Sequence, residues 1–131
     1  MSTPKLFAYL SYRNAPAGIE WLKAIGFTVV RQQDGSDGTI QHAELRLGNA
    51  VIMVASFDND YDRPRLLHRS TGGGLYMLVA NVSEMYKKAL DAGGTSVFEP
   101  EKTEWGSERA RVLDPEGVEW SFGTYEPGAV W

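Results

Sequence analysis

The sequence predicts an α+β fold built from two copies of one βαβββ module. One observation is that the segments from Asn14 to Gly26 and from Asn81 to Gly93 have the same length and both end at a glycine, which suits a helix terminus. A second is that each segment is flanked by short stretches in which apolar and polar residues alternate, as in half-buried strands. A four-stranded sheet in one module cannot bury both faces alone, so we expect the modules to pair with their helices on the outer face.

The first module is expected over about residues 6–56. Leu6–Tyr12 alternates as a strand, and Asn14 then offers a helix cap with Pro16 in the first turn. The apolar face of this helix has three residues: Ala15, Ile19 and Leu22. Three further strands are expected at Phe27–Gln33, Thr39–Leu47 and Ala50–Ser56.

The second module is expected over about residues 74–126. It begins with a strand at Leu75–Ala80, and Ser83 is expected to cap the helix. The apolar face of this helix has four residues: Val82, Tyr86, Ala89 and Leu90. Strands follow at Thr95–Glu99, Glu108–Leu113 and Val118–Tyr125. The polar stretch 57–73 is a connector between the modules, so residues 1–131 are expected to be a single domain.

The last two predicted strands form a hairpin with two chemically different faces. The turn Asp114-Pro115-Glu116-Gly117 joins them, because proline presets φ and glycine accepts a backbone that other residues avoid. After the turn, Val118, Trp120 and Phe122 point toward a core. Glu119 and Ser121 point to the other face, where we expect function.

This hairpin resembles the last two strands of the vicinal-oxygen-chelate superfamily, which includes glyoxalases, bleomycin-resistance proteins and extradiol dioxygenases. The sequence Asp-Pro-Glu-Gly followed, two residues on, by Trp-Ser-Phe-Gly-Thr-Tyr is near-identical to the ending of many members of the bleomycin-resistance-like branch. The resemblance extends from about Leu6 to Glu126. It implies curved mixed sheets that enclose clefts for small molecules, and a homodimer in which strands are often exchanged between subunits.

Metal-dependent members of that superfamily hold one divalent ion with His, Glu or Gln from the first and last strands of each module. The resemblance carries these places onto Phe7, Met53, Leu75 and Ser121, or onto Ala8 and Tyr76 with a slip of one residue. Apolar side chains have no lone pair for a hard ion, and methionine suits soft ions only. We therefore expect neither a metal nor another cofactor. The missing metal ligands favour a binding protein over an enzyme. His42 and Glu44, two apart on one strand face, leave a relocated ion as the alternative.

Alternation along the strands places a mixture of aromatic and charged side chains on the cleft side, as in many small-molecule pockets. Trp105 is singled out because it lies in the polar loop Glu101–Ser107, where a large ring has no local packing role. The aromatic rings are expected to sandwich a planar ligand. The expected ligand-binding residues are Phe7, Tyr9, His42, Glu44, Met53, Phe57, Tyr61, Trp105, Arg109, Arg111, Glu119 and Ser121.

Composition and charge argue against nucleic acid and membranes as partners. The 131 residues include no cysteine and carry a formal net charge of −4, and no basic run or membrane-length apolar run is present. We expect a cytoplasmic protein that binds neither nucleic acid nor membrane.

The sequence thus predicts a metal-independent binding protein. Its expected partner is a planar antibiotic or metabolite of cationic or peptide-like character, which it sequesters in an aromatic-lined cleft. One alternative is a metal-dependent glyoxalase-like lyase, isomerase or dioxygenase. Another is a dimeric accessory protein without a small ligand. The sequence does not identify the ligand.

Overall fold

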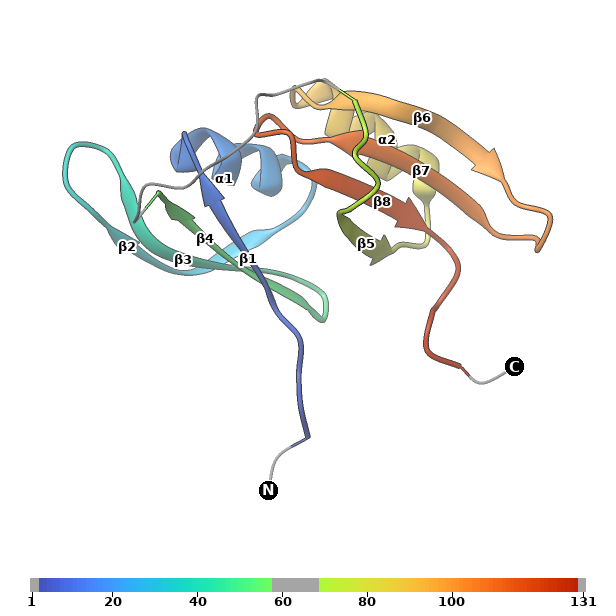
Figure 1. The fold of residues 1–131 in the computed structure, drawn as a ribbon, viewed down its shortest axis with the longest axis horizontal. Helices are drawn as coiled ribbons and strands as arrows, with labels where there is room; N and C mark the ends of the chain where they lie inside the picture. The colour runs from blue at the N-terminus through green and yellow to red at the C-terminus, as the bar shows by residue number, and fades with distance from the viewer. Residues whose placement is uncertain (1–2, 58–68, 130–131) are drawn as a thin grey trace. The chain divides into compact units, whose positions relative to one another are not determined.

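A computed structural model describes residues 3–57 and 69–129. The chain divides into two compact units, residues 1–64 and 65–131. Each unit contains one βαβββ module, as predicted (Figure 1). The elements of the first unit are β1 (Ala8–Tyr12), α1 (Ala15–Ala24), β2 (Thr28–Asp34), β3 (Ile40–Leu47) and β4 (Ala50–Ser56). Those of the second are β5 (Leu75–Leu78), α2 (Val82–Asp91), β6 (Thr95–Lys102), β7 (Glu108–Leu113) and β8 (Glu119–Gly123).

The two sheets have the same topology. Their strand orders are β1-β4-β3-β2 and β5-β8-β7-β6, so the first strand of each module lies at an edge beside the last. That pair is parallel, and the other pairs are antiparallel. The prediction of an α+β fold with mixed sheets is therefore confirmed.

Asparagine caps begin both helices. The Asn14 side chain accepts a hydrogen bond from the backbone N–H of Ala17 at 3.2 Å, as predicted. In α2 the cap is Asn81, whose Oδ1 accepts from the backbone N–H of Glu84 at 3.0 Å. The prediction that Ser83 caps this helix is wrong, because a cap residue precedes the first helical residue and Ser83 lies inside α2.

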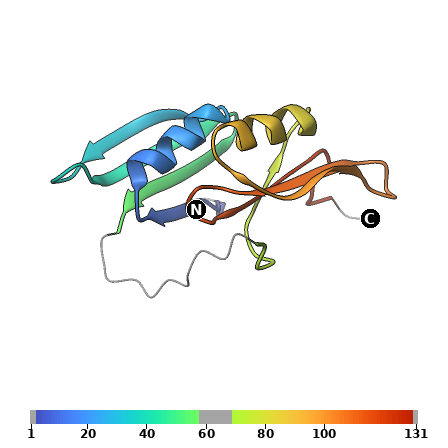
Figure 2. The same ribbon diagram turned by 90° about the horizontal axis from the view of Figure 1, so that it is seen from above.

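The core of the first unit lies between its sheet and α1, which covers one sheet face (Figure 2). Ala43, Leu45 and Val54 are almost fully buried on that face, as the alternation predicts. Tyr12 is also buried there, and its ring occupies the space that a Cβ at Gly18 would need. Alternation along Leu6–Tyr12 also predicts that Leu6 packs on this face. That prediction is wrong, because β1 begins at Ala8 and Leu6 is 98% exposed.

The core of the second unit is formed by the hairpin under α2. Ala110, Val112 and Phe122 are fully buried, and Trp120 is 2% exposed. The buried Asp114 carboxylate accepts hydrogen bonds from the backbone of the turn, at 2.9 Å from Glu116 N and 3.0 Å from Val118 N, and from the Trp120 indole at 3.0 Å. The turn therefore fixes the core tryptophan directly.

Some strand ends differ from the prediction. β6 continues to Lys102 because it is an edge strand, where Pro100 removes no essential ladder hydrogen bond. Its register shifts twice against β7, between Ser96 and Phe98 and between Phe98 and Glu101. β5 and β8 are shorter than predicted.

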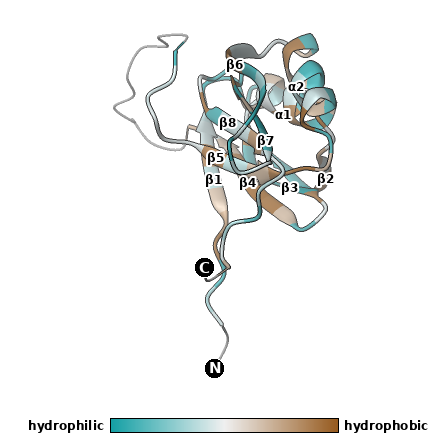
Figure 3. Ribbon diagram, turned by 90° about the vertical axis from the view of Figure 1, so that its right-hand side faces the viewer, coloured by the Kyte–Doolittle hydropathy of each residue, from teal (hydrophilic) through white to brown (hydrophobic). Residues whose placement is uncertain are grey.

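Both helices carry hydrophobic and hydrophilic residues, which appear in different colours in Figure 3. Each helix has ten residues. Within the described residues, no helix is therefore long and apolar enough to cross a membrane.

Candidate functional site

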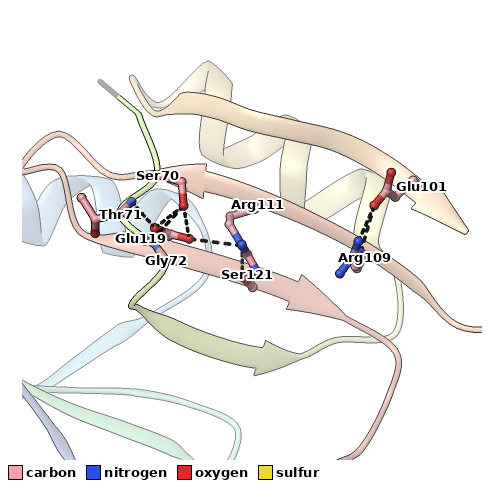
Figure 4. A network of polar contacts seen from close by, with 8 residues as sticks. All are labelled: Ser70, Thr71, Gly72, Glu101, Arg109, Arg111, Glu119 and Ser121. Atoms are coloured by element: carbon pink, nitrogen blue, oxygen red, sulfur yellow. Dashed lines mark hydrogen bonds and ion pairs between the residues drawn. The ribbon is translucent and has the colours of Figure 1, made fainter. Parts of the chain in front are cut away.

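A polar network covers the face of the second unit's sheet that points away from α2 (Figure 4). Arg111 on β7 lies opposite Ser121 on β8, and its Nε donates to the Ser121 hydroxyl at 2.6 Å. The same Nε is 3.3 Å from Oε1 of Glu119. The hairpin thus brings together three residues that the sequence assigned to the cleft.

Glu119 lies on this face as predicted, but its side chain is only 4% exposed. The Ser70 hydroxyl lies 2.8 Å from both carboxylate oxygens, and the backbone N–H of Thr71 donates to Oε2 at 3.2 Å. With Arg111, these contacts occupy the carboxylate. Glu119 therefore fastens the segment that leads into β5 to the sheet, which is a structural role that the sequence did not predict.

Arg109 makes a second ion pair on the same face. Its Nε and Nη2 both lie 2.9 Å from Oε1 of Glu101 on β6. The guanidinium carbons of Arg109 and Arg111 lie 5.0 and 5.1 Å from the centroid of the Phe98 ring, within the range of cation–π attraction. Sequence reasoning missed Phe98 because the register shifts in β6 break the alternation that would have assigned its face.

A pocket of about 350 Å³ lies beside this network, where the β6–β7 loop meets the segment after β8. Trp105, which is 76% exposed, forms one wall at the tip of the β6–β7 hairpin. Tyr76 and Tyr125 form another, and the Tyr76 hydroxyl donates to the Tyr125 carbonyl at 2.6 Å. The remaining lining residues are Thr103, Ser107, Glu108 and Arg109.

Local hydrogen bonds shape this pocket. The Thr103 and Ser107 hydroxyls are 2.7 Å apart and close the loop that carries Trp105. Burial raises the pKa of Tyr76, so its phenol remains a neutral donor at physiological pH. Of the lining residues, the sequence singled out Trp105 and Arg109. Tyr125 was missed because its segment was expected to be strand and instead follows the end of β8.

The first unit carries a smaller polar group on the sheet face away from α1. His42 Nε2 and Glu44 Oε2 on β3 are 2.8 Å apart, with about a third of each side chain exposed. The hydrogen bond from His42, followed by the charges of His42 and Arg31, lowers the pKa of Glu44. Within residues 3–57 and 69–129, no group of three or more His, Asp or Glu side chains is placed to hold a metal ion.

Strand register shows which residues stand at the predicted metal places. Tyr9 pairs with Met53, and Tyr76 pairs with Ser121. Leu75 instead pairs with the core residue Trp120. Phe7 precedes β1 and is 47% exposed. Tyr76 is the alternative that a slip of one residue gave for the second module, whereas Tyr9 lies two residues beyond Phe7 and one beyond Ala8.

The other predicted aromatic residues are divided between the units. Tyr61 lies outside the described residues. Phe57 is half-buried, and the Arg13 guanidinium carbon lies 6.0 Å from its ring centroid. Phe57 and Tyr9 belong to the first unit and Trp105 to the second. A single aromatic sandwich that joins them stays a prediction.

The chain is similar to a known protein family, to curated relatives and to solved structures. The model of the Glyoxalase/Bleomycin resistance protein/Dioxygenase superfamily matches residues 9–122. The chain belongs to this superfamily. Within it, the chain is 31% identical over 130 residues to uncharacterized proteins of Mycobacterium bovis and Mycobacterium tuberculosis. Each match covers 92% of the chain, and the matches cover 82% and 74% of the two relatives, respectively.

Two solved structures have a fold similar to that of this chain. TioX from Micromonospora sp. ML1 superposes with a TM-score of 0.70 and 26% identity, covering 97% of this chain and all of that one. A glyoxalase-related enzyme from Fulvimarina pelagi also gives 0.70, with 14% identity and coverage of 93% and 88%. The second likeness concerns the fold alone.

Proposed function

We propose that this superfamily member is a metal-independent binding protein that holds a planar antibiotic or metabolite against Trp105. The observation that carries the proposal is the pocket of the second unit. It combines three aromatic side chains with a few polar groups, and ligand pockets have this composition. Trp105 is 76% exposed, so its ring adds little to the core and presents a large apolar surface to a ligand.

The polar groups of the second unit support binding without chemistry. The Glu119 carboxylate, the acidic group on β8, is already held by Ser70, Thr71 and Arg111. Arg109 is neutralised by Glu101. These groups are therefore engaged with one another, and they can shape and orient a site.

Two further features belong to the proposal. We expect the protein to act as a homodimer, as the resemblance implies. We also expect it to reside in the cytoplasm, because the sequence has no cysteine and needs no oxidising compartment.

Calorimetric titration with a panel of antibiotics that carry a planar ring system, bleomycin among them, tests this function. We expect at least one of them to bind saturably in the presence of EDTA and to be recovered unchanged. Trp105→Ala should weaken its affinity roughly tenfold, since a stacked ring contributes about 0.5–1.5 kcal/mol beyond area burial. Leu78→Ala, on β5 of the same unit and 47% exposed, is the matched control. Binding that is insensitive to Trp105→Ala, or turnover that a divalent ion restores, would refute the proposal.

A further inference from the structure

We propose that the ligand of the Trp105 pocket joins a planar ring to a zwitterionic, amino-acid-like end, which a second hollow receives. This inference rests on the proposed function and specifies the ligand's chemical class. The second hollow, about 360 Å³, lies beside the first. Thr103, Trp105 and Arg109 line both. One ligand can therefore contact both hollows across the Trp105 ring.

The two hollows differ in chemistry. The first has the phenol rings of Tyr76 and Tyr125 as its own walls, together with Ser107 and Glu108, and the surface that it presents is mostly apolar. The second has instead Glu101, Lys102 and Glu104, besides the shared residues. A ligand that fills both must therefore be apolar at one end and charged or polar at the other.

The charges of the second hollow are balanced. Glu101 and Arg109 form an ion pair, with both guanidinium contacts at 2.9 Å. Lys102 and Glu104, both exposed, add one charge of each sign. A ligand end with a single charge meets one attractive and one repulsive neighbour there. A zwitterionic end offers an ammonium group to Glu104 and a carboxylate to Lys102, so both contacts are attractive.

The sizes of the hollows support the division. Pockets that enclose a whole drug-sized ligand span roughly 300–1,000 Å³. At about 350 and 360 Å³, each hollow lies near the lower limit. Each hollow is therefore large enough for a ring or for a charged end, and the two together have room for a ligand that carries both.

Three indole compounds with the same ring and different arms test the inference. These are free L-tryptophan, which is zwitterionic, tryptamine, which is cationic, and indole-propionate, which is anionic. Binding to isotope-labelled protein is followed by the NMR signal of the Trp105 indole N–H. Because an exposed ion pair contributes only modestly, we expect L-tryptophan to bind roughly threefold more tightly than either single-charge compound.

Two charge variants test whether Lys102 and Glu104 cause the expected preference for L-tryptophan. Lys102→Gln should weaken L-tryptophan and indole-propionate but not tryptamine, whereas Glu104→Gln should weaken L-tryptophan and tryptamine but not indole-propionate. Lys87→Gln and Glu99→Gln, exposed positions of the same unit outside both hollows, are the controls. Equal affinities for the three compounds, with the Trp105 signal shifted by all, would overturn this inference and leave the proposed function intact. If no compound shifts that signal at millimolar concentration, both fail.

Discussion

Single buried carboxylates hold the second unit together. Asp114 lies in the β7–β8 turn, where it accepts three hydrogen bonds, one of them from the core residue Trp120. Glu119, two residues after the turn, fixes the segment before β5 through Ser70 and Thr71. Both acids are about 4% exposed. Buried donors that lose their acceptor are costly, so these positions should be sensitive to substitution.

Asp114→Ala should lower the free energy of unfolding by roughly 3 kcal/mol, because three donors, including the buried Trp120 indole, lose their acceptor. Urea denaturation followed by tryptophan fluorescence measures the loss. Asp91→Ala, at the exposed end of α2, should change stability by less than about 0.5 kcal/mol. Equal effects of the two substitutions would show that the Asp114 hydrogen bonds do not stabilise the hairpin.

Glu119→Ala should cost roughly 3 kcal/mol, since it leaves Arg111 without its carboxylate partner in a half-buried site. Ser70→Ala removes one hydroxyl and should cost about 1 kcal/mol. Both variants should speed hydrogen exchange at the Thr71 amide, which now donates to Glu119. Unchanged exchange in Glu119→Ala would contradict the fastening role of this carboxylate.

The His42–Glu44 pair makes a prediction about pH. Because Glu44 has a lowered pKa in the folded protein, its contribution to stability is present at neutral pH and is lost as the pH falls below about 4.5 through the folded pKa. His42→Ala should raise the pKa of Glu44 toward its ordinary value, and Arg31→Ala should raise it less, since the hydrogen bond is the larger cause. Carbon NMR titration of the Glu44 carboxyl measures both. A larger rise in Arg31→Ala would reverse this assignment.

At the scale of elements, local sequence signals located most helices and strands. Alternation gave β4 and β7 their observed bounds and assigned the buried faces of β3, β4 and β7. The errors arise where tertiary contacts decide. Leu6 alternates with the residues of β1, but pairing with β4 begins only at Ala8. The bulged register of β6 hid Phe98 from the same reasoning.

Packing between α1 and β1 depends on a glycine inside the helix. A Cβ at Gly18 would clash with the Tyr12 ring, so Gly18→Ala should destabilise the protein by about 1–3 kcal/mol despite the better helix propensity of alanine. Thermal unfolding measures this effect. In a Tyr12→Ala background the clash is gone, and Gly18→Ala should then be neutral or stabilising. The same cost in both backgrounds would exclude the clash as its cause.

At the scale of the whole molecule, equal segment lengths and alternation predicted the two-module architecture. The resemblance of the hairpin predicted the superfamily, and the family match over residues 9–122 confirms that membership. The candidate site was predictable only in part. Trp105 stood out as a large ring in a polar loop, and Arg109 as a charge on the outer sheet face. The contributions of Tyr76 and Tyr125 depend on a contact between segments 49 residues apart, which no local pattern reports.

The central claim is that Trp105 forms the wall of a metal-independent binding pocket. An NMR titration of isotope-labelled protein with free indole, in the presence of EDTA, tests it most directly. The indole N–H signal of Trp105 should shift saturably, while the signals of Trp21 and Trp120, which are 1% and 2% exposed, remain in place as internal references. If the Trp105 signal stays fixed at millimolar indole, or shifts only when a divalent ion replaces the chelator, the claim is contradicted.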